Sequence, residues 1–149
     1  MVLRRKVSSA ASICLNAERN DVFKFLIDPK NTKRWNKAVE YVSHRPQGPI
    51  RVGTVASCRV GFLGTSIGLV YRIVDLDEPN SFLGEGSSST FNYTSRFDLD
   101  SSSDGGRTDV TWSVAIEYSA ILPIAASYVT REISSGINRN LAILRGLFV

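Results

Sequence analysis

The sequence predicts an α+β fold, in which a curved antiparallel sheet of about seven strands wraps around a long C-terminal helix, with two short helices after strand 1. Apolar and polar side chains alternate with the period of strands from residue 39 to residue 118, and the helical period takes over from residue 121. Helical patterns lie only before and after this strand region, which is the segregated order of α+β folds. A chain of 149 residues is expected to form one domain, residues 1–149.

The N-terminal region predicts one strand followed by two short helices. Residues 8–15 alternate small or apolar side chains with polar ones, as a first strand does. Asn16 is expected to cap the next helix, in which the apolar side chains of residues 22–27 recur at helical spacing. Pro29 ends this helix, because the residue before a proline avoids the helical conformation. A second short helix is expected over residues 31–37.

Six further strands are expected between the two helical regions. Turn signals at Asp77–Asn80 and at Asp104-Gly105-Gly106 each separate two successive strands. The last strand has one continuous apolar face, which we expect to point inward. The pattern of the second of these strands leaves its inward face open. The first of the six strands is expected to begin at Val39. The other five are expected to cover residues 52–62, 67–74, 82–87, 91–99 and 110–118.

The C-terminal helix carries an apolar stripe from Ile121 to Phe148 and is expected to include Pro123 in its first turn. Such a helix must bury its stripe, and the inner face of the curved sheet is the available surface. A space left between the two would be a typical ligand site. Gly136, in mid-helix, should cost about 1 kcal/mol relative to alanine. Close approach to the sheet or a ligand would explain it, and a harmless surface glycine is the alternative.

Charge and cysteine content set limits on the function. The formal net charge is +4, and five basic residues fall within residues 24–37. They form either a solvated helical face or a basic rim that meets an anionic ligand or surface. No apolar run approaches the roughly 18 residues of a membrane span, and no secretion signal follows Met1, so we expect a cytoplasmic protein. Cys14 and Cys58 are expected to be reduced thiols in the core.

Four motifs follow one another along the chain: Val22–Leu26 with Asp28-Pro29 and Arg34-Trp35, the strand Leu69–Leu76 running into Glu78-Pro79, Arg107–Trp112 after a glycine turn, and the helix after Pro123. In this order they resemble the polyketide cyclase/dehydrase and lipid-transport group of the START-like, or SRPBCC, superfamily. The resemblance spans nearly the whole chain. It implies a helix-grip fold with a deep hydrophobic cavity between the sheet and the last helix. The superfamily contains binders, cyclases and transfer proteins, so the resemblance does not select one activity.

The expected cavity residues are aromatic and aliphatic side chains on inward strand faces, the short helices and the last helix. Trp35 would be either a wall of the cavity mouth or a plug that anchors its helix, and Trp112 either core or ligand contact. The hydroxyls of Tyr71, Tyr93 and Tyr118 would orient a ligand or bond to backbone at the sheet rim. The full set is Phe25, Trp35, Val39, Tyr41, Leu69, Tyr71, Phe82, Tyr93, Phe97, Trp112, Val114, Ile124, Tyr128 and Ile133.

Catalytic groups are sparse. Arg59 and Glu85 are the candidates, because an inward pair could bind a carbonyl or carboxylate and transfer a proton. A cross-strand surface pair is the other interpretation. The only histidine, His44, is expected at a surface turn. One histidine and two distant cysteines argue against a metal site, and no glycine-rich phosphate loop points to a cofactor.

The favoured hypothesis is therefore binding, and transport, of a hydrophobic small molecule or lipid in this cavity. A polyketide aromatase or cyclase acting in the same cavity is the alternative, since such catalysis depends mainly on shape. An interaction module that contacts a membrane or acidic partner is a third. Nucleic acid is not expected, because the aromatic residues lie apart from the basic ones. The basic contact would use Lys24, Lys30, Lys33, Arg34 and Lys37.

Overall fold

A computed structural model describes residues 3–45 and 48–149. The sequence also predicts a turn over residues 46–49, of which Pro46 and Gln47 lie outside the described residues. The described part contains seven strands and three helices, confirming the predicted fold class. In chain order they are β1 (Arg4–Leu15), α1 (Arg19–Ile27), α2 (Pro29–Trp35), β2 (Val39–Arg45), β3 (Val55–Phe62), β4 (Thr65–Asp77), β5 (Ser81–Ser87), β6 (Phe91–Ser101), β7 (Thr108–Ser119) and α3 (Ala126–Leu147).

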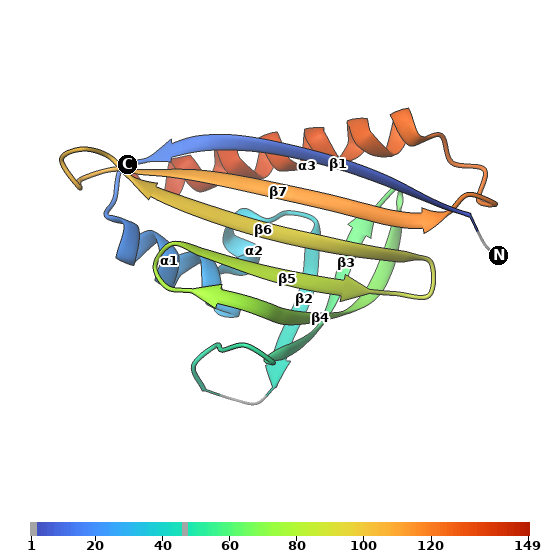
Figure 1. The fold of residues 1–149 in the computed structure, drawn as a ribbon, viewed down its shortest axis with the longest axis horizontal. Helices are drawn as coiled ribbons and strands as arrows, with labels where there is room; N and C mark the ends of the chain where they lie inside the picture. Colours follow the sequence, from blue (N-terminus) through green and yellow to red (C-terminus); the bar gives the residue numbers. More distant parts are fainter. Residues whose placement is uncertain (1–2, 46–47) are drawn as a thin grey trace.

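The strands form one antiparallel sheet in the order β1-β7-β6-β5-β4-β3-β2. β1 and β2 follow each other in the chain, yet they form opposite edges of the sheet. The chain crosses between these edges through α1 and α2, which lie on the same side of the sheet as α3 (Figure 1). α3 packs along β1 and also contacts α2. The sheet therefore curls around one side that three helices partly fill.

The alternation along each strand decides which side chains reach that inner side. On β7, Val110, Trp112, Ile116 and Tyr118 are buried, as the continuous apolar face predicted. On β3, Ala56 is buried and faces inward, whereas Arg59 is exposed. The inward face that the sequence left open is thus the one that carries Ala56, Cys58, Val60 and Phe62.

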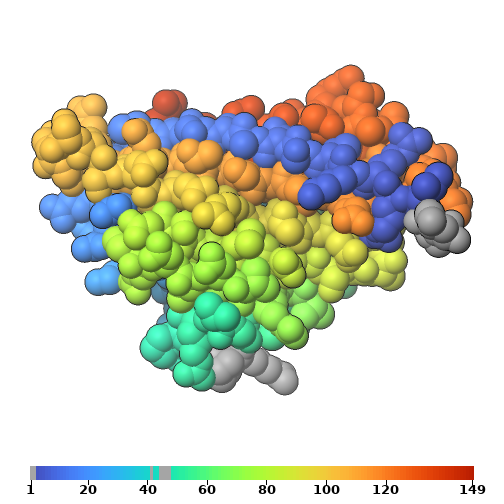
Figure 2. Space-filling view, viewed as in Figure 1, coloured from blue at the N-terminus to red at the C-terminus, as the bar shows by residue number. Residues whose placement is uncertain are grey.

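The outer face of the sheet is covered by side chains of β1, β7, β6 and β5, which run as successive bands across the molecule (Figure 2). Across the described residues no deep hollow interrupts this face. Arg72 is exposed here, and Arg96 donates to the Asp98 carboxylate at 3.1 Å. Any large binding space must therefore lie on the inner side.

Both predicted helix starts near the N-terminus are wrong. α1 begins at Arg19 after Glu18, and Asn16 does not cap it, because residues 16–18 still form the connection from β1. α2 begins at Pro29, two residues earlier than predicted. The Asp28 carboxylate accepts the Lys30 N–H at 3.0 Å, and Pro29 suits a first turn, where a missing N–H costs nothing.

α3 also begins later than predicted, at Ala126, so Pro123 lies outside its first turn. Ile121 is not part of the buried stripe, because its side chain is 81% exposed. Ala125, the residue before the helix, is extended, and the Tyr118 hydroxyl donates to the Ile124 carbonyl at 3.1 Å. Among the described residues, no helix has the length and apolar character needed to cross a membrane.

Candidate ligand-binding site

A cavity of about 750 Å³ lies between the inner face of the sheet, α2 and α3. Strands β2 to β7 supply its wall, and residues 132–140 of α3 lie opposite. Exposed residues such as Lys37, Glu40 and Arg139 also line it, so one side meets solvent. The curled sheet is wider than one helix can fill, and the cavity is the remaining space.

The structure brings ten of the predicted residues to this cavity. They come from five strands and from helices α2 and α3, which the sequence alone does not place together. The ten are Trp35, Val39, Leu69, Tyr71, Phe82, Tyr93, Phe97, Trp112, Val114 and Ile133.

Three predicted cavity residues lie elsewhere. Phe25 packs edge-on against Phe148, with ring centroids 5.1 Å apart, and the Arg34 guanidinium covers its ring. Tyr128 is 44% exposed near the start of α3. Ile124 precedes α3 and packs beside the core without lining the cavity. The side chain of Tyr41 lies outside the described residues.

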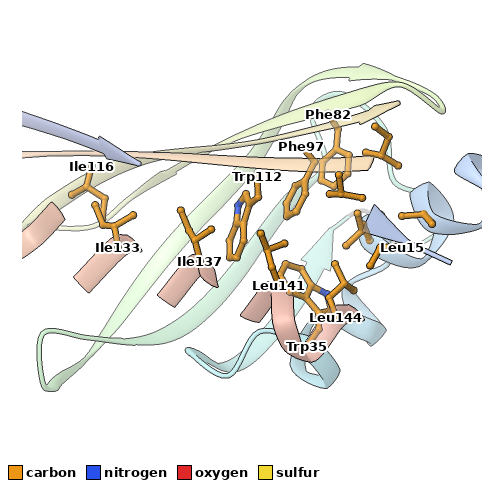
Figure 3. Close-up of a cluster of buried hydrophobic side chains, with 14 of the residues drawn as sticks. Leu15, Trp35, Phe82, Phe97, Trp112, Ile116, Ile133, Ile137, Leu141 and Leu144 are labelled. Atoms are coloured by element: carbon orange, nitrogen blue, oxygen red, sulfur yellow. The ribbon is translucent and has the colours of Figure 1, made fainter. Parts of the chain in front are cut away.

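An aromatic cluster forms one end of the cavity. The Trp112 ring stacks on Phe97 at 5.3 Å, and Trp35 meets Trp112 edge-on at 5.2 Å. Figure 3 places Trp112 and Phe97 on the sheet above Ile137 and Leu141 of α3, with Trp35 beside Leu144. Trp35 is therefore both a cavity wall and an anchor of α2. Trp112 Nε1 donates to Ser95 Oγ at 2.9 Å, whereas Trp35 Nε1 is buried without a partner among the described residues.

The three predicted tyrosines have different environments. Tyr118 is fully buried and donates to backbone, so its hydroxyl is not free to orient a ligand. Tyr71 and Tyr93 line the cavity with their rings stacked 5.9 Å apart. Burial raises the pKa of both phenols well above the ordinary value; Cys58 adds to the rise at both, and Tyr71 adds to the rise at Tyr93. Both hydroxyls are therefore neutral at physiological pH.

The two thiols also differ from each other, and Cys14 is exposed on β1, so its prediction as a core thiol is wrong. Cys58 is half-buried and lines the cavity, and burial raises its pKa to about 11. Because the thiolate is the reactive form, we expect native protein to react quickly with a disulfide reagent at pH 8 through Cys14 alone. Denatured protein should show both thiols. Fast reaction of both in the native state would contradict this placement.

The catalytic candidates do not enter the cavity. Arg59 Nε donates to Ser66 Oγ at 3.0 Å on the exposed surface, and Glu85 is exposed opposite Arg72. The inward pair on which the catalytic hypothesis depended is therefore not formed, because both residues occupy outward positions of their strands. His44 lies within β2 rather than in a turn, and its side chain lies outside the described residues.

No group of three or more histidine, cysteine, aspartate or glutamate side chains is placed to hold a metal ion within the described residues. The basic segment is a property of the surface. All five side chains, from Lys24 to Lys37, are exposed on α1, α2 and the connection to β2. Of these residues, Lys37 lines the cavity.

The sequence analysis did not identify Asn140, which lies within the apolar stripe of α3 and is only 4% exposed. Its Oδ1 accepts the Lys37 N–H and its Nδ2 donates to Asn36 Oδ1, both at 3.1 Å. It thus ties the connection between α2 and β2 to α3 beside the cavity. A polar residue within the stripe was the signal that could have found it.

Gly136 lines the cavity, and open space surrounds the position where a Cβ would be. It therefore does not approach the sheet closely. We expect Gly136→Ala to raise the free energy of unfolding by about 1 kcal/mol, because alanine favours a helix interior. Gly105→Ala should lower it by about 1–2 kcal/mol, because φ is +74° there. Urea denaturation measures both, and a loss of stability in Gly136→Ala would contradict the open space.

Fold and cavity together define a START-like protein, and comparison with known proteins agrees. The sequence matches the family described as polyketide cyclase / dehydrase and lipid transport over residues 6–144, so the chain belongs to that family. No curated protein matches the sequence.

Solved structures are similar in fold at low sequence identity. A START superfamily protein from Mycobacterium smegmatis has a TM-score of 0.78 at 12% identity, over 95% of this chain and 96% of that one. XoxI from Bacillus cereus has a TM-score of 0.74 at 11% identity, over 95% of each chain. Ara h 8.0201 has a TM-score of 0.70 at 13% identity, over 97% and 98%.

Proposed function

We propose that the protein binds a hydrophobic small molecule or lipid in the cavity between the sheet and α3, and carries it. The observation that carries this proposal is the cavity itself: about 750 Å³ of space lined mainly by aliphatic and aromatic side chains. Ligand sites of roughly 300–1,000 Å³ with such walls are typical for small molecules. The family and the fold support hydrophobic ligand binding as the general class.

Binding is favoured over catalysis by the position of the charged groups. The lining residues of β3, β4, β6 and β7 carry no charge among the described residues. The two catalytic candidates, Arg59 and Glu85, point outward. A cyclase that works by shape alone would still use this cavity, but no observed group favours a particular reaction.

Native mass spectrometry of freshly purified protein tests the proposal directly. We expect a mass excess that disappears on denaturation, or saturable binding when lipids and aromatic compounds are added. The site is located by a cavity-filling variant. Gly136→Leu should weaken binding about tenfold, because its side chain occupies space where the ligand would lie.

Gly146→Leu is the matched control, since Gly146 is an exposed α3 glycine, also with open space at the Cβ position. It should leave binding unchanged. Equal effects of the two variants, or binding that neither variant changes, would place the ligand outside the cavity.

Ligand exchange at an anionic surface is a second proposed role. Its motivation is the exposed basic segment, one residue of which, Lys37, also lines the cavity. We expect Lys30→Glu/Lys33→Glu to reduce co-sedimentation with vesicles that contain anionic lipid, and high salt to do the same. Arg5→Glu/Lys6→Glu, at two exposed positions of β1, is the charge-matched control. Undiminished sedimentation of the double variant would exclude this role.

A further inference from the structure

Two glycines in β5 make room for the tyrosines of the neighbouring strands. A Cβ at Gly84 would overlap the Tyr71 hydroxyl, and a Cβ at Gly86 would overlap the Tyr93 ring. Tyr71 and Tyr93 flank Gly86 directly in the sheet register, on β4 and β6. The rings therefore lie over bare backbone along the sheet, with the Tyr71 hydroxyl above Gly84. Any side chain at these glycines would push a ring into the cavity.

The hydroxyls that this arrangement presents have no hydrogen-bond partner among the described residues. Within the described part of the chain, neither Tyr71 nor Tyr93 makes a side-chain hydrogen bond, while Tyr118 and Trp112 do. Ser95, opposite Gly84 on β6, accepts from Trp112 and retains its own proton for donation. Three hydroxyls, from Tyr71, Tyr93 and Ser95, thus line the same wall of the cavity.

The side chains of this cavity wall carry no charge. Phenols and a serine are uncharged at physiological pH, and the nearby Cys58 thiol also keeps its proton. The charged lining residues belong to other elements: Lys37 and Glu40 to the region after α2, and Glu132 and Arg139 to α3. A ligand carboxylate at this wall would lose its hydration without gaining a cation on the same strands, and such a burial of charge is costly. An uncharged acceptor group would accept hydrogen bonds from the same hydroxyls at a smaller desolvation cost.

We infer that Tyr71, Tyr93 and Ser95 form a polar subsite that selects ligands with an uncharged carbonyl group on an apolar body, over hydrocarbons and over carboxylates. Gly84 and Gly86 keep the two phenols in position for it. This inference rests on the proposed function, because it names the ligand class that the same cavity takes.

The test uses three probes of nearly equal shape: 2-acetylanthracene, 2-ethylanthracene and anthracene-2-carboxylate, titrated by fluorescence. Wild-type protein should bind the ketone about tenfold more tightly than either of the others, as expected for hydrogen bonds to otherwise unpartnered hydroxyls. Tyr71→Phe/Tyr93→Phe keeps both rings and should remove the preference over the hydrocarbon while leaving hydrocarbon affinity unchanged. Tyr128→Phe, on the exposed side of α3, is the matched control and should keep the preference.

Gly84→Ala supplies an independent variant. It retains every hydroxyl but displaces Tyr71, so it should also lose the preference. Equal affinity of wild-type protein for ketone and hydrocarbon, or a preference retained in the double phenylalanine variant, would overturn the inference and leave the proposed function intact. Failure of all three probes to bind would overturn the inference; the proposed function falls with it only if native mass spectrometry also finds no bound ligand.

Discussion

Replacing Trp112 by alanine is expected to lower the free energy of unfolding by about 3–5 kcal/mol, as for other buried aromatic residues. The indole is only 7% exposed, stacks on Phe97 and meets Trp35 edge-on. Its removal also takes away the hydrogen bond to Ser95. Urea denaturation followed by circular dichroism measures the loss. A change below about 1 kcal/mol would show that the cluster does not support the fold.

Phenylalanine substitutions separate packing from hydrogen bonding. Trp112→Phe loses ring volume and a formed hydrogen bond, whereas Trp35→Phe loses ring volume and an unpartnered buried N–H. An unpartnered buried donor is destabilising, so its removal offsets part of the lost packing. Trp112→Phe should therefore cost about 1 kcal/mol more than Trp35→Phe. Equal losses would mean that the Trp35 N–H has a partner in solution, such as a water molecule.

The strand alternation explains why the fold could be predicted. Trp112 and Phe97 lie on apolar faces with a period of two, and that period alone puts both on the inner side. The same reasoning failed at helix ends. Asn16 is a good cap by residue type, but the connection from β1 extends to Glu18. Local preferences cannot tell how many residues a connection needs.

The sequence predicts those site residues whose inward position follows from strand alternation. It does not predict contacts that depend on residues from other parts of the chain. Tyr71 and Tyr118 have the same apolar pattern, yet one hydroxyl meets the cavity and the other a carbonyl. Phe25 has helical spacing but packs against the chain end at Phe148. The role of Gly84 depends on a ring from the adjacent strand, and only the register of the sheet reveals it.

Asn140 couples the cavity mouth to the longest helix. Asn140 is 4% exposed, and its amide group bonds both to the Lys37 backbone and to Asn36, whose Oδ1 also accepts the Ala38 N–H at 3.1 Å. These contacts join residues more than one hundred positions apart in the chain. They hold the connection from α2 to β2 at one distance from α3, so they fix the width of the cavity on that side.

Asn140→Leu is therefore expected to lower the free energy of unfolding by about 1–3 kcal/mol. Leucine fits an apolar stripe, but it removes two partly buried hydrogen bonds: the Lys37 N–H loses its acceptor, and Asn36 Oδ1 keeps only the Ala38 N–H. Each such bond contributes about 0.5–1.5 kcal/mol. Asn138→Leu is the matched control: it makes the same change at an exposed position of α3, and should change stability by less than about 0.5 kcal/mol. Hydrogen exchange should also become faster at the amide of Lys37, since its acceptor is gone. Unchanged exchange together with unchanged stability would mean that the mouth is held by α2 packing through Trp35 and not by this amide.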